Sequence, residues 1–185
     1  MAQSQQPLVL TEKGKKVFGS ESEVLRAIQN AKPLRDGYGN HGIVSMFKFS
    51  EAPFAVKTYK QVHHLPESGD AQAAEYARII DAFQKASLEE LMAANYTVRL
   101  KVPEVYAFNK NTLVMELVPV KSRLDLMGSH RDLICVYSGV YDKVLASTRI
   151  PLGSAGKLFV GHVEPVKKQV DFFLLDPNVP EPIRA

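Results

Sequence analysis

The stretch Asp36-Gly37-Tyr38-Gly39-Asn40-His41-Gly42-Ile43-Val44 decides how the fold is interpreted. Its glycines follow the pattern G-x-G-x-x-G-x-V, a spacing found both in helix-opening loops and in β-hairpins. The residues that follow, Ile43 to Phe49, are β-branched, aromatic and alternating, and therefore predict a strand. Glycines at a hairpin tip leave backbone N–H groups unobstructed, so Gly37, Gly39 and Gly42 are candidates to cover phosphate groups.

A second motif, Phe54-Ala55-Val56-Lys57, lies on the next predicted strand. Ala55 and Lys57 are two residues apart and therefore point to the same side of a strand. Ala55 leaves room for a flat ring, and Lys57 supplies the point charge suited to phosphates. With Val44, which closes the glycine motif, they form a candidate binding surface. Glu75, in the first turns of a helix predicted over 71–94, is spaced to reach Lys57 and orient it.

The remaining chain has an α+β order of elements, without the regular alternation of a doubly wound parallel sheet. Residues 1–20 are expected to be a loosely structured lead-in. The other predicted elements are a helix over 21–31 capped by Ser20 with Glu23, strands Val102–Phe108 and Thr112–Val118, a helix over 130–147, and a hairpin of Lys157–Val163 with Val170–Leu175.

The runs Val102-Pro103-Glu104-Val105 and Leu113-Val114-Met115-Glu116-Leu117-Val118 add the most specific resemblance. With the glycines and Lys57, they make the chain resemble the protein-kinase-like superfamily, in particular the RIO-type and aminoglycoside-phosphotransferase-like atypical kinases. The resemblance implies a five-stranded antiparallel N-lobe sheet with a C-helix and a strongly reduced C-lobe. Met115 would be the gatekeeper, and Glu116 to Val118 would offer backbone groups to adenine.

The same resemblance assigns ATP and Mg²⁺ as cofactors. Phe172-Phe173-Leu174-Leu175-Asp176-Pro177-Asn178 is similar to the metal-binding strand of these families, with Asp176 as the Mg²⁺ ligand. It also implies three segments: an N-terminal extension over 1–33, a kinase-like N-lobe over 34–118, and a reduced C-lobe with tail over 119–185.

The catalytic loop departs from the family pattern. His130-Arg131-Asp132 lacks the asparagine that should follow and lies inside a predicted helix, so we interpret it as a coincidence. One alignment makes Glu164 the catalytic base, with Gln169 in the asparagine position. The other, which hairpin geometry favours, places the loop at Ile150 to Lys157 and leaves no base. The chain is therefore predicted to be an ATP-binding minimal kinase-like protein with a divergent catalytic loop that transfers phosphate to protein Ser/Thr. The alternative is an inactive pseudokinase that serves as an interaction module, and a missing base does not decide between the two.

Composition restricts the other classes of function. The chain has 185 residues with a net charge of +3 and acids and bases interspersed, so nothing indicates a nucleic-acid partner. Its single cysteine, Cys135, excludes a disulfide framework, and adjacent His63 and His64 do not form a metal motif. No apolar run is long enough to span a bilayer. The start lacks the pattern of a cleavable signal peptide, which favours the cytoplasm or export into a host cell by another route.

Overall fold

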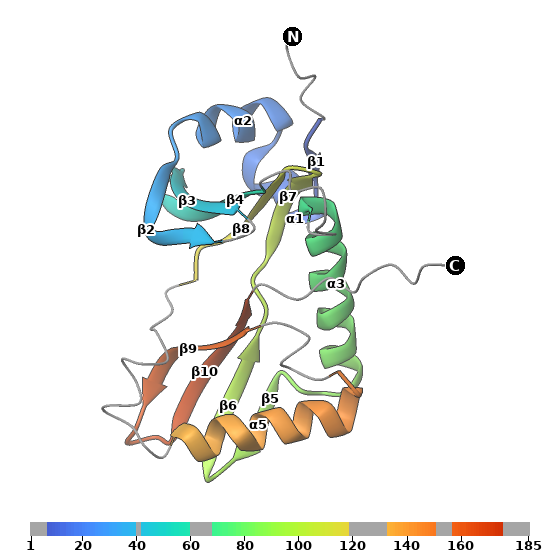
Figure 1. The fold of residues 1–185 in the computed structure, drawn as a ribbon, viewed down its shortest axis with the longest axis vertical. Coiled ribbons are helices and arrows are strands. Elements are labelled where there is room, and N and C mark those ends of the chain that lie inside the picture. The colour runs from blue at the N-terminus through green and yellow to red at the C-terminus, as the bar shows by residue number, and fades with distance from the viewer. Residues whose placement is uncertain (1–6, 40–41, 60–67, 119–132, 151–156, 176–185) are drawn as a thin grey trace. The chain divides into compact units, whose positions relative to one another are not determined.

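The computed structural model describes residues 7–39, 42–59, 68–118, 133–150 and 157–175. In these residues the fold is α+β, as predicted, with four helices, a six-stranded sheet and a four-stranded sheet (Figure 1). The chain divides into two compact units, and the division falls inside helix α3, between Ala74 and Glu75. The segment 104–117 belongs to the first unit and the segment 75–103 to the second. This division differs from boundaries at 33 and 118, because 75–103 clusters with the C-terminal hairpin.

The first unit is built on the six-stranded sheet, in which every neighbouring pair of strands is antiparallel. In spatial order its strands are β1 (Val9–Leu10), β7 (Val105–Asn109), β8 (Thr112–Glu116), β4 (Ala52–Tyr59), β3 (Gly42–Phe49) and β2 (Lys32–Gly39). The resemblance implied five strands, and β1 is the additional one. The strand predicted over Val102–Phe108 begins only at Val105.

The N-terminal region is part of this unit, so the expectation of a loosely structured lead-in over 1–20 was wrong for the described residues. After β1 the chain forms α1 (Glu12–Phe18) and α2 (Glu21–Gln29). The predicted cap of α2 is confirmed, because the Ser20 side chain accepts a hydrogen bond from the Glu23 N–H at 3.4 Å. Both helices contribute to the hydrophobic cluster of the unit, formed by Leu8, Phe18, Val24, Phe47, Phe54, Val56, Ala107 and Val114.

The second unit is built on a four-stranded sheet ordered β5 (Glu90–Ala93), β6 (Tyr96–Lys101), β10 (Gln169–Leu175) and β9 (Lys157–Glu164). The predicted C-terminal hairpin is confirmed, since β9 and β10 pair antiparallel. Sequence reasoning missed the parallel pairing of β10 with β6. The C-terminal sheet therefore also uses residues 90–101, which the kinase resemblance had placed in the N-lobe.

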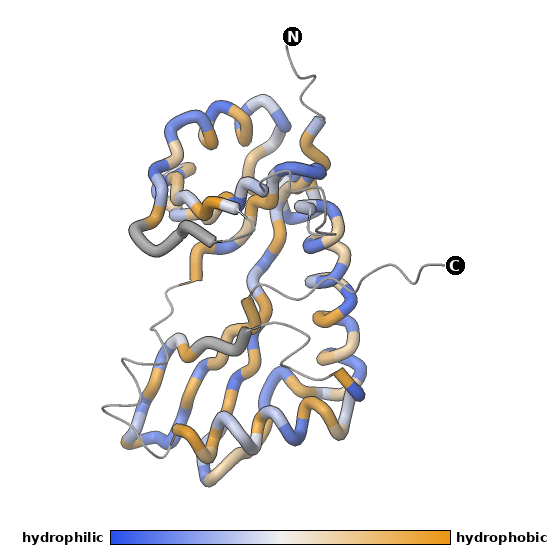
Figure 2. The backbone as a smooth tube through the Cα atoms, viewed as in Figure 1, coloured by the Kyte–Doolittle hydropathy of each residue, from blue (hydrophilic) through white to orange (hydrophobic). Residues whose placement is uncertain are grey.

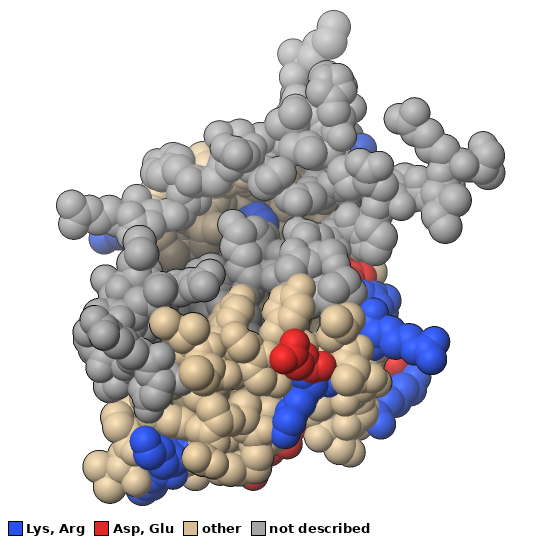
Figure 3. Space-filling view, turned by 60° about the horizontal axis from the view of Figure 1, so that its bottom comes forward, with Lys and Arg blue, Asp and Glu red and all other residues tan. Residues whose placement is uncertain are grey.

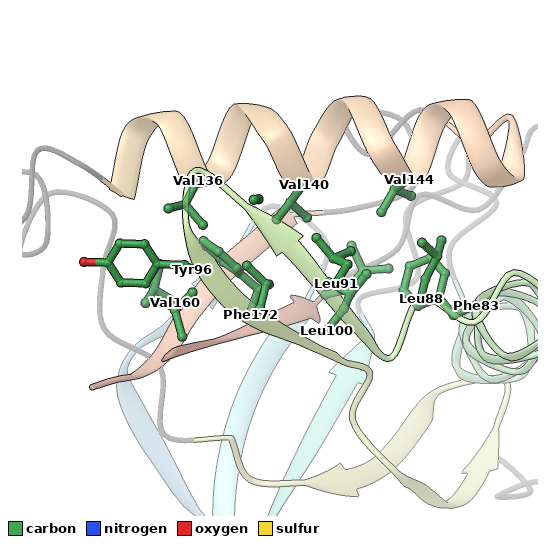
Figure 4. Close-up of a cluster of buried hydrophobic side chains, with 14 of the residues drawn as sticks. Phe83, Leu88, Leu91, Tyr96, Leu100, Val136, Val140, Val144, Val160 and Phe172 are labelled. Atoms are coloured by element: carbon green, nitrogen blue, oxygen red, sulfur yellow. The ribbon is translucent and has the colours of Figure 1, made fainter. Parts of the chain in front are cut away.

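Helix α5 (Leu133–Thr148) covers one face of this sheet, close to the prediction of a helix over 130–147. Val136, Val140 and Val144 point from the helix towards the strands and are fully buried (Figure 4). Strand residues such as Leu91, Leu100 and Phe172 complete the cluster. Hydrophobic residues on the strands and on the helix are visible along the backbone in Figure 2.

The outward side of α5 is exposed but mostly uncharged. Ile134 and Leu145 are exposed on this helix, and Figure 3 shows a largely uncharged surface with acidic and basic groups in its middle and at its edges. Val136, Val140 and Val144 recur every four residues, so they form one buried row on the helix.

Helix α3 (Gly69–Lys85) is shorter than the predicted helix over 71–94. The chain turns at Ala86–Ser87, where Ser87 adopts a left-handed φ of 51°, and β5 then begins at Glu90. In β5 the side chains alternate, with Leu91 and Ala93 buried and Met92 exposed. Good helix formers are held in a strand here because β5 pairs with β6 and contributes to the core of the sheet.

Candidate nucleotide site

The candidate residues on three central strands of the first unit lie on one face of the sheet. Val44 of β3 is directly opposite Lys57 of β4, and Ala55 of β4 is directly opposite Met115 of β8. Directly opposed residues in an antiparallel pair project to the same side, as do residues two apart along a strand. The sheet thus brings Val44, Ala55, Lys57 and Met115 together, as the sequence motifs predicted.

The other face of these strands holds the hydrophobic cluster of the unit. Phe54 and Val56 alternate with Ala55 and Lys57 along β4, and both pack with Phe18 of α1 in that cluster. Aromatic rings reinforce the contact, with centroids of Phe18 and Phe54 5.0 Å apart and those of Phe47 and Phe54 5.5 Å apart. The core of this unit and the candidate binding face are therefore on opposite sides of one sheet.

The glycine motif forms the predicted hairpin, in which Gly39 of β2 is paired with Gly42 of β3. The register between the two strands shifts between Pro33 and Tyr38. A Cβ on Gly42 would lie 2.4 Å from the carbonyl oxygen of Thr58 on β4. Gly42 is thus required by the close approach of β3 to β4, which explains this glycine without any ligand.

Lys57 is the central charged residue of the candidate face, and it is buried, with 7% of its surface exposed. Its Nζ lies 4.9 Å from the ring centroid of Tyr59, the next residue on the same side of β4. A cation over an aromatic face is attracted by the quadrupole of the ring. Tyr59 was missed by sequence reasoning, although its spacing from Lys57 would have placed it on this face.

Glu75 is also buried, at 6% exposed, and belongs to the second unit. Its two carboxylate oxygens accept hydrogen bonds from Arg78, from Nε at 2.9 Å and from a terminal nitrogen at 2.6 Å. The hydrogen bond from Arg78 to Glu75 is the main cause of the raised pKa of Arg78. Sequence reasoning missed this i,i+3 pair, and the predicted orientation of Lys57 by Glu75 stays a prediction.

The predicted adenine-binding segment follows the candidate face along β8. The strand ends at Glu116, whose N–H donates to the carbonyl of Glu104 at 2.8 Å. Val118 lies beyond the strand and is half-buried. The amide of Glu116 is therefore engaged within the protein, and backbone contacts to a ligand would have to come from its carbonyl and from residues 117–118.

The predicted Mg²⁺ ligand Asp176 lies outside the described residues, as do Leu152 and His63–His64. The residue before Asp176, Leu175, ends β10 and is paired with Lys157. Glu164 is paired with Gln169 at the other end of the hairpin. Leu175 is six residues further along β10 than Gln169 (175 − 169 = 6), roughly 20 Å at about 3.3 Å per residue. The hairpin therefore argues against Glu164 as a base acting beside Asp176.

The surroundings of Glu164 explain its charge without a catalytic role. Its carboxylate is bound by Lys167 at 2.8 Å and lies 3.2 Å from the Nε2 of His162. The hydrogen bonds with Lys167 and then His162 lower the pKa of Glu164. A carboxylate with a lowered pKa is a poor proton acceptor at neutral pH.

A polar cluster that sequence reasoning missed lies on the second sheet. Asp171 of β10 is buried and accepts from Arg99 Nε at 2.7 Å and from Lys101 Nζ at 2.8 Å, both on β6. Lys101 also lies 5.4 Å from the ring centroid of Phe173. Because the contacts join residues about 70 positions apart, no local pattern in the sequence indicated them.

Comparison with known proteins gives no match, either to a protein-family model or to a curated protein sequence. Among the described residues, no group of three or more His, Cys, Asp or Glu side chains is arranged to hold a metal ion. None of the described helices combines the length and apolar character needed to cross a membrane.

Proposed function

We propose that the chain binds ATP with Mg²⁺ on the candidate face of the first unit, as a minimal kinase-like protein with a divergent catalytic loop. The observation that carries the proposal is the placement of Lys57, a buried lysine at the middle of a sheet face that also presents Val44, Ala55 and Met115. A lysine ammonium is a compact point charge suited to phosphate oxygens, so its position on this face favours a phosphate-bearing ligand.

The architecture of the first unit supports the same proposal. Five of its six strands, from β2 through β3, β4 and β8 to β7, form an antiparallel sheet, and α3 follows β4 in the chain. The resemblance implies a five-stranded antiparallel sheet and a helix, so this order of elements favours the proposal. The glycine hairpin β2–β3 forms one end of that sheet, beside the strand that carries Lys57.

The residues present fit a nucleotide in two respects. Ala55 has no side-chain atom beyond Cβ, so its own side chain would not obstruct a planar base beside Met115. Lys57 would bind the phosphates, Gly37, Gly39 and Gly42 would cover them, and Asp176 would hold Mg²⁺. When bound, Mg²⁺ would neutralise phosphate charge, the main requirement of phosphoryl transfer.

Binding is tested by the change in melting temperature on addition of ATP and Mg²⁺. Ligand that binds only the folded state stabilises it by RT ln(1 + [L]/Kd), so at a hundredfold excess over Kd we expect about 2.7 kcal/mol. Lys57→Met should remove this shift. Lys48→Met is the matched control, because Lys48 is an exposed lysine on the neighbouring strand. Lack of a shift in the wild type, or a full shift in Lys57→Met, would contradict the proposal.

Transfer is tested separately with labelled ATP and a protein Ser/Thr acceptor, using the wild type and Asp176→Ala. Label incorporation that Asp176→Ala abolishes supports a kinase. ATP binding without incorporation supports the alternative, a pseudokinase whose nucleotide-bound fold serves as an interaction module. The position of Glu164 at the far end of the β9–β10 hairpin favours this alternative.

A further inference from the structure

The N-terminal segment Thr11–Gly14 contacts three residues at the start of β7, which are Glu104, Val105 and Tyr106. The Thr11 N–H donates to the carbonyl of Tyr106 at 2.9 Å, and its hydroxyl donates to the carbonyl of Val105 at 2.9 Å. Lys13 of α1 forms an ion pair with Glu104 at 2.5 Å. A Cβ on Gly14 would lie only 1.9 Å from the carbonyl oxygen of Tyr106, so the helix packs directly on the strand.

Glu104 in turn contacts the end of β8. The Glu116 N–H donates to the Glu104 carbonyl at 2.8 Å, and the Glu104 N–H donates to a carboxylate oxygen of Glu116 at 3.4 Å. Glu116 directly follows Met115, which is paired with Ala55 on the candidate face. A continuous series of contacts thus runs from Lys13 through Glu104 to Glu116.

We propose that Lys13 and Glu104 are positioning residues for the proposed nucleotide site, holding the end of β8 through α1. This inference rests on the proposed function, because it assigns a role to the segment that would contact adenine. Neither residue lies on the candidate face with Lys57. They act by fixing the backbone of Glu116, whose carbonyl then has a defined direction.

The electrostatics of Tyr106 support the closeness of these groups. Burial is the main cause that raises the pKa of Tyr106, the carboxylates of Glu116 and Glu104 raise it further, and Lys13 lowers it. All three charged side chains of the series therefore affect the pKa of Tyr106, in agreement with the contacts.

A charge reversal and its rescue test the inference. Lys13→Glu places a second carboxylate beside Glu104, and Lys13→Glu with Glu104→Lys restores an ion pair of opposite polarity. Lys15→Glu is the matched control, because Lys15 is on the same helix with the same exposure, 60%, and its ion pair is with Glu12 of α1 itself. The two readouts are ATP affinity and hydrogen exchange of the Glu116 amide without nucleotide.

We expect Lys13→Glu to weaken ATP binding two- to fivefold, the range for an ion pair of this exposure, and to accelerate exchange at Glu116. The double variant should return both values towards the wild type, and Lys15→Glu should change neither. If hydrogen exchange at Glu116 is unchanged in Lys13→Glu, the inference is overturned, whether or not the ATP affinity changes. Changed exchange without any ATP binding by the wild type confirms the link but removes the proposed function. Changed exchange with unchanged ATP affinity shows a purely structural contact and also overturns the positioning role.

Discussion

The Asp171 carboxylate accepts a hydrogen bond from Arg99 at 2.7 Å, so a buried acid on β10 is held by the strand to which β10 pairs in parallel. Lys101 binds the other carboxylate oxygen. Parallel strands cannot be joined by a tight turn, and these side-chain contacts help to fix which residues of β6 and β10 are opposed.

Replacing Asp171 by Asn should destabilise the protein by about 1–3 kcal/mol. The substitution removes the charge that two cations bind, and leaves their donors with a weaker partner. We expect a smaller loss of stability than for a fully buried ion pair, because the side chains of Arg99 and Lys101 are 42% and 43% exposed. Urea unfolding measures the change. Asp81→Asn, which breaks an exposed pair with Lys85, should cost less than about 0.5 kcal/mol, and equal losses at both sites would contradict the argument.

Gly14→Ala should destabilise the first unit by about 1–3 kcal/mol, because the new methyl group would collide with the Tyr106 carbonyl. Gly19→Ala provides the comparison. Gly19 has a φ of 74° but nothing within 4 Å of an added Cβ, so its cost is conformational only, about 1 kcal/mol. Thermal unfolding of both variants should rank Gly14→Ala as the less stable. The reverse order would show that α1 moves away from β7 at little cost.

Glu51→Gly should stabilise the protein by about 0.5–1 kcal/mol. Ser50 and Glu51 form the turn between β3 and β4, and both have a left-handed φ, 48° and 67°. Hairpin turns of this kind favour glycine at the second turn position, which Glu51 occupies here, because glycine adopts positive φ without strain. Lys48→Gly in β3 is the control, and should destabilise because glycine weakens a strand. A loss of stability in both variants, measured by urea unfolding, would refute the turn assignment.

The alkaline stability of the protein should depend on Tyr106. Because its folded pKa is raised above the ordinary value of about 10, the folded state binds the phenolic proton more tightly than the unfolded chain. The resulting stabilisation is complete below about pH 10 and is lost as the pH rises through the folded value. Tyr106→Phe removes this contribution. The difference in unfolding free energy between wild type and variant should therefore change with pH only in the alkaline range, and parallel curves from pH 7 upwards would exclude the effect.

Local signals in the sequence predicted the elements that depend on neighbouring residues. The cap of α2 by Ser20, the helix α5 and the hairpin of β9 with β10 are all specified within a short stretch of chain. Alternation along the predicted strand placed Ala55 and Lys57 on one side before the structure was known, whereas the register that brings Val44 opposite Lys57 was not predicted.

Elements that depend on distant partners were not predicted. Residues 88–93 contain leucine, glutamate, methionine and alanine, which favour a helix locally, yet β5 is stabilised by pairing with β6 and by the core under α5. The N-terminal β1 is only two residues long, and its partner β7 lies almost 100 residues later. A pattern of so few residues carries no recognisable periodicity.

The candidate site could likewise be predicted from the sequence only in part. Spacing identified Lys57 and its neighbours on the sheet, but not the cation–aromatic contact with Tyr59 or the binding of Glu75 by Arg78. It also left two alignments of the catalytic loop open, and the hairpin register weakens the one that uses Glu164. Side-chain partners are decided by packing, which a motif does not encode.

The pairing of β1 with β7 has a consequence for the solubility of the protein. Without β1, the outer backbone groups of β7 would form an open sheet edge, and such edges pair readily with other chains. Val9 and Leu10 occupy part of that edge, and Thr11 bonds the carbonyl of Tyr106 next to it. A shortened chain that begins at Gly19 should therefore self-associate at concentrations at which the full chain stays monodisperse by light scattering. We therefore expect the segment Val9–Thr11 to protect this sheet edge against aggregation.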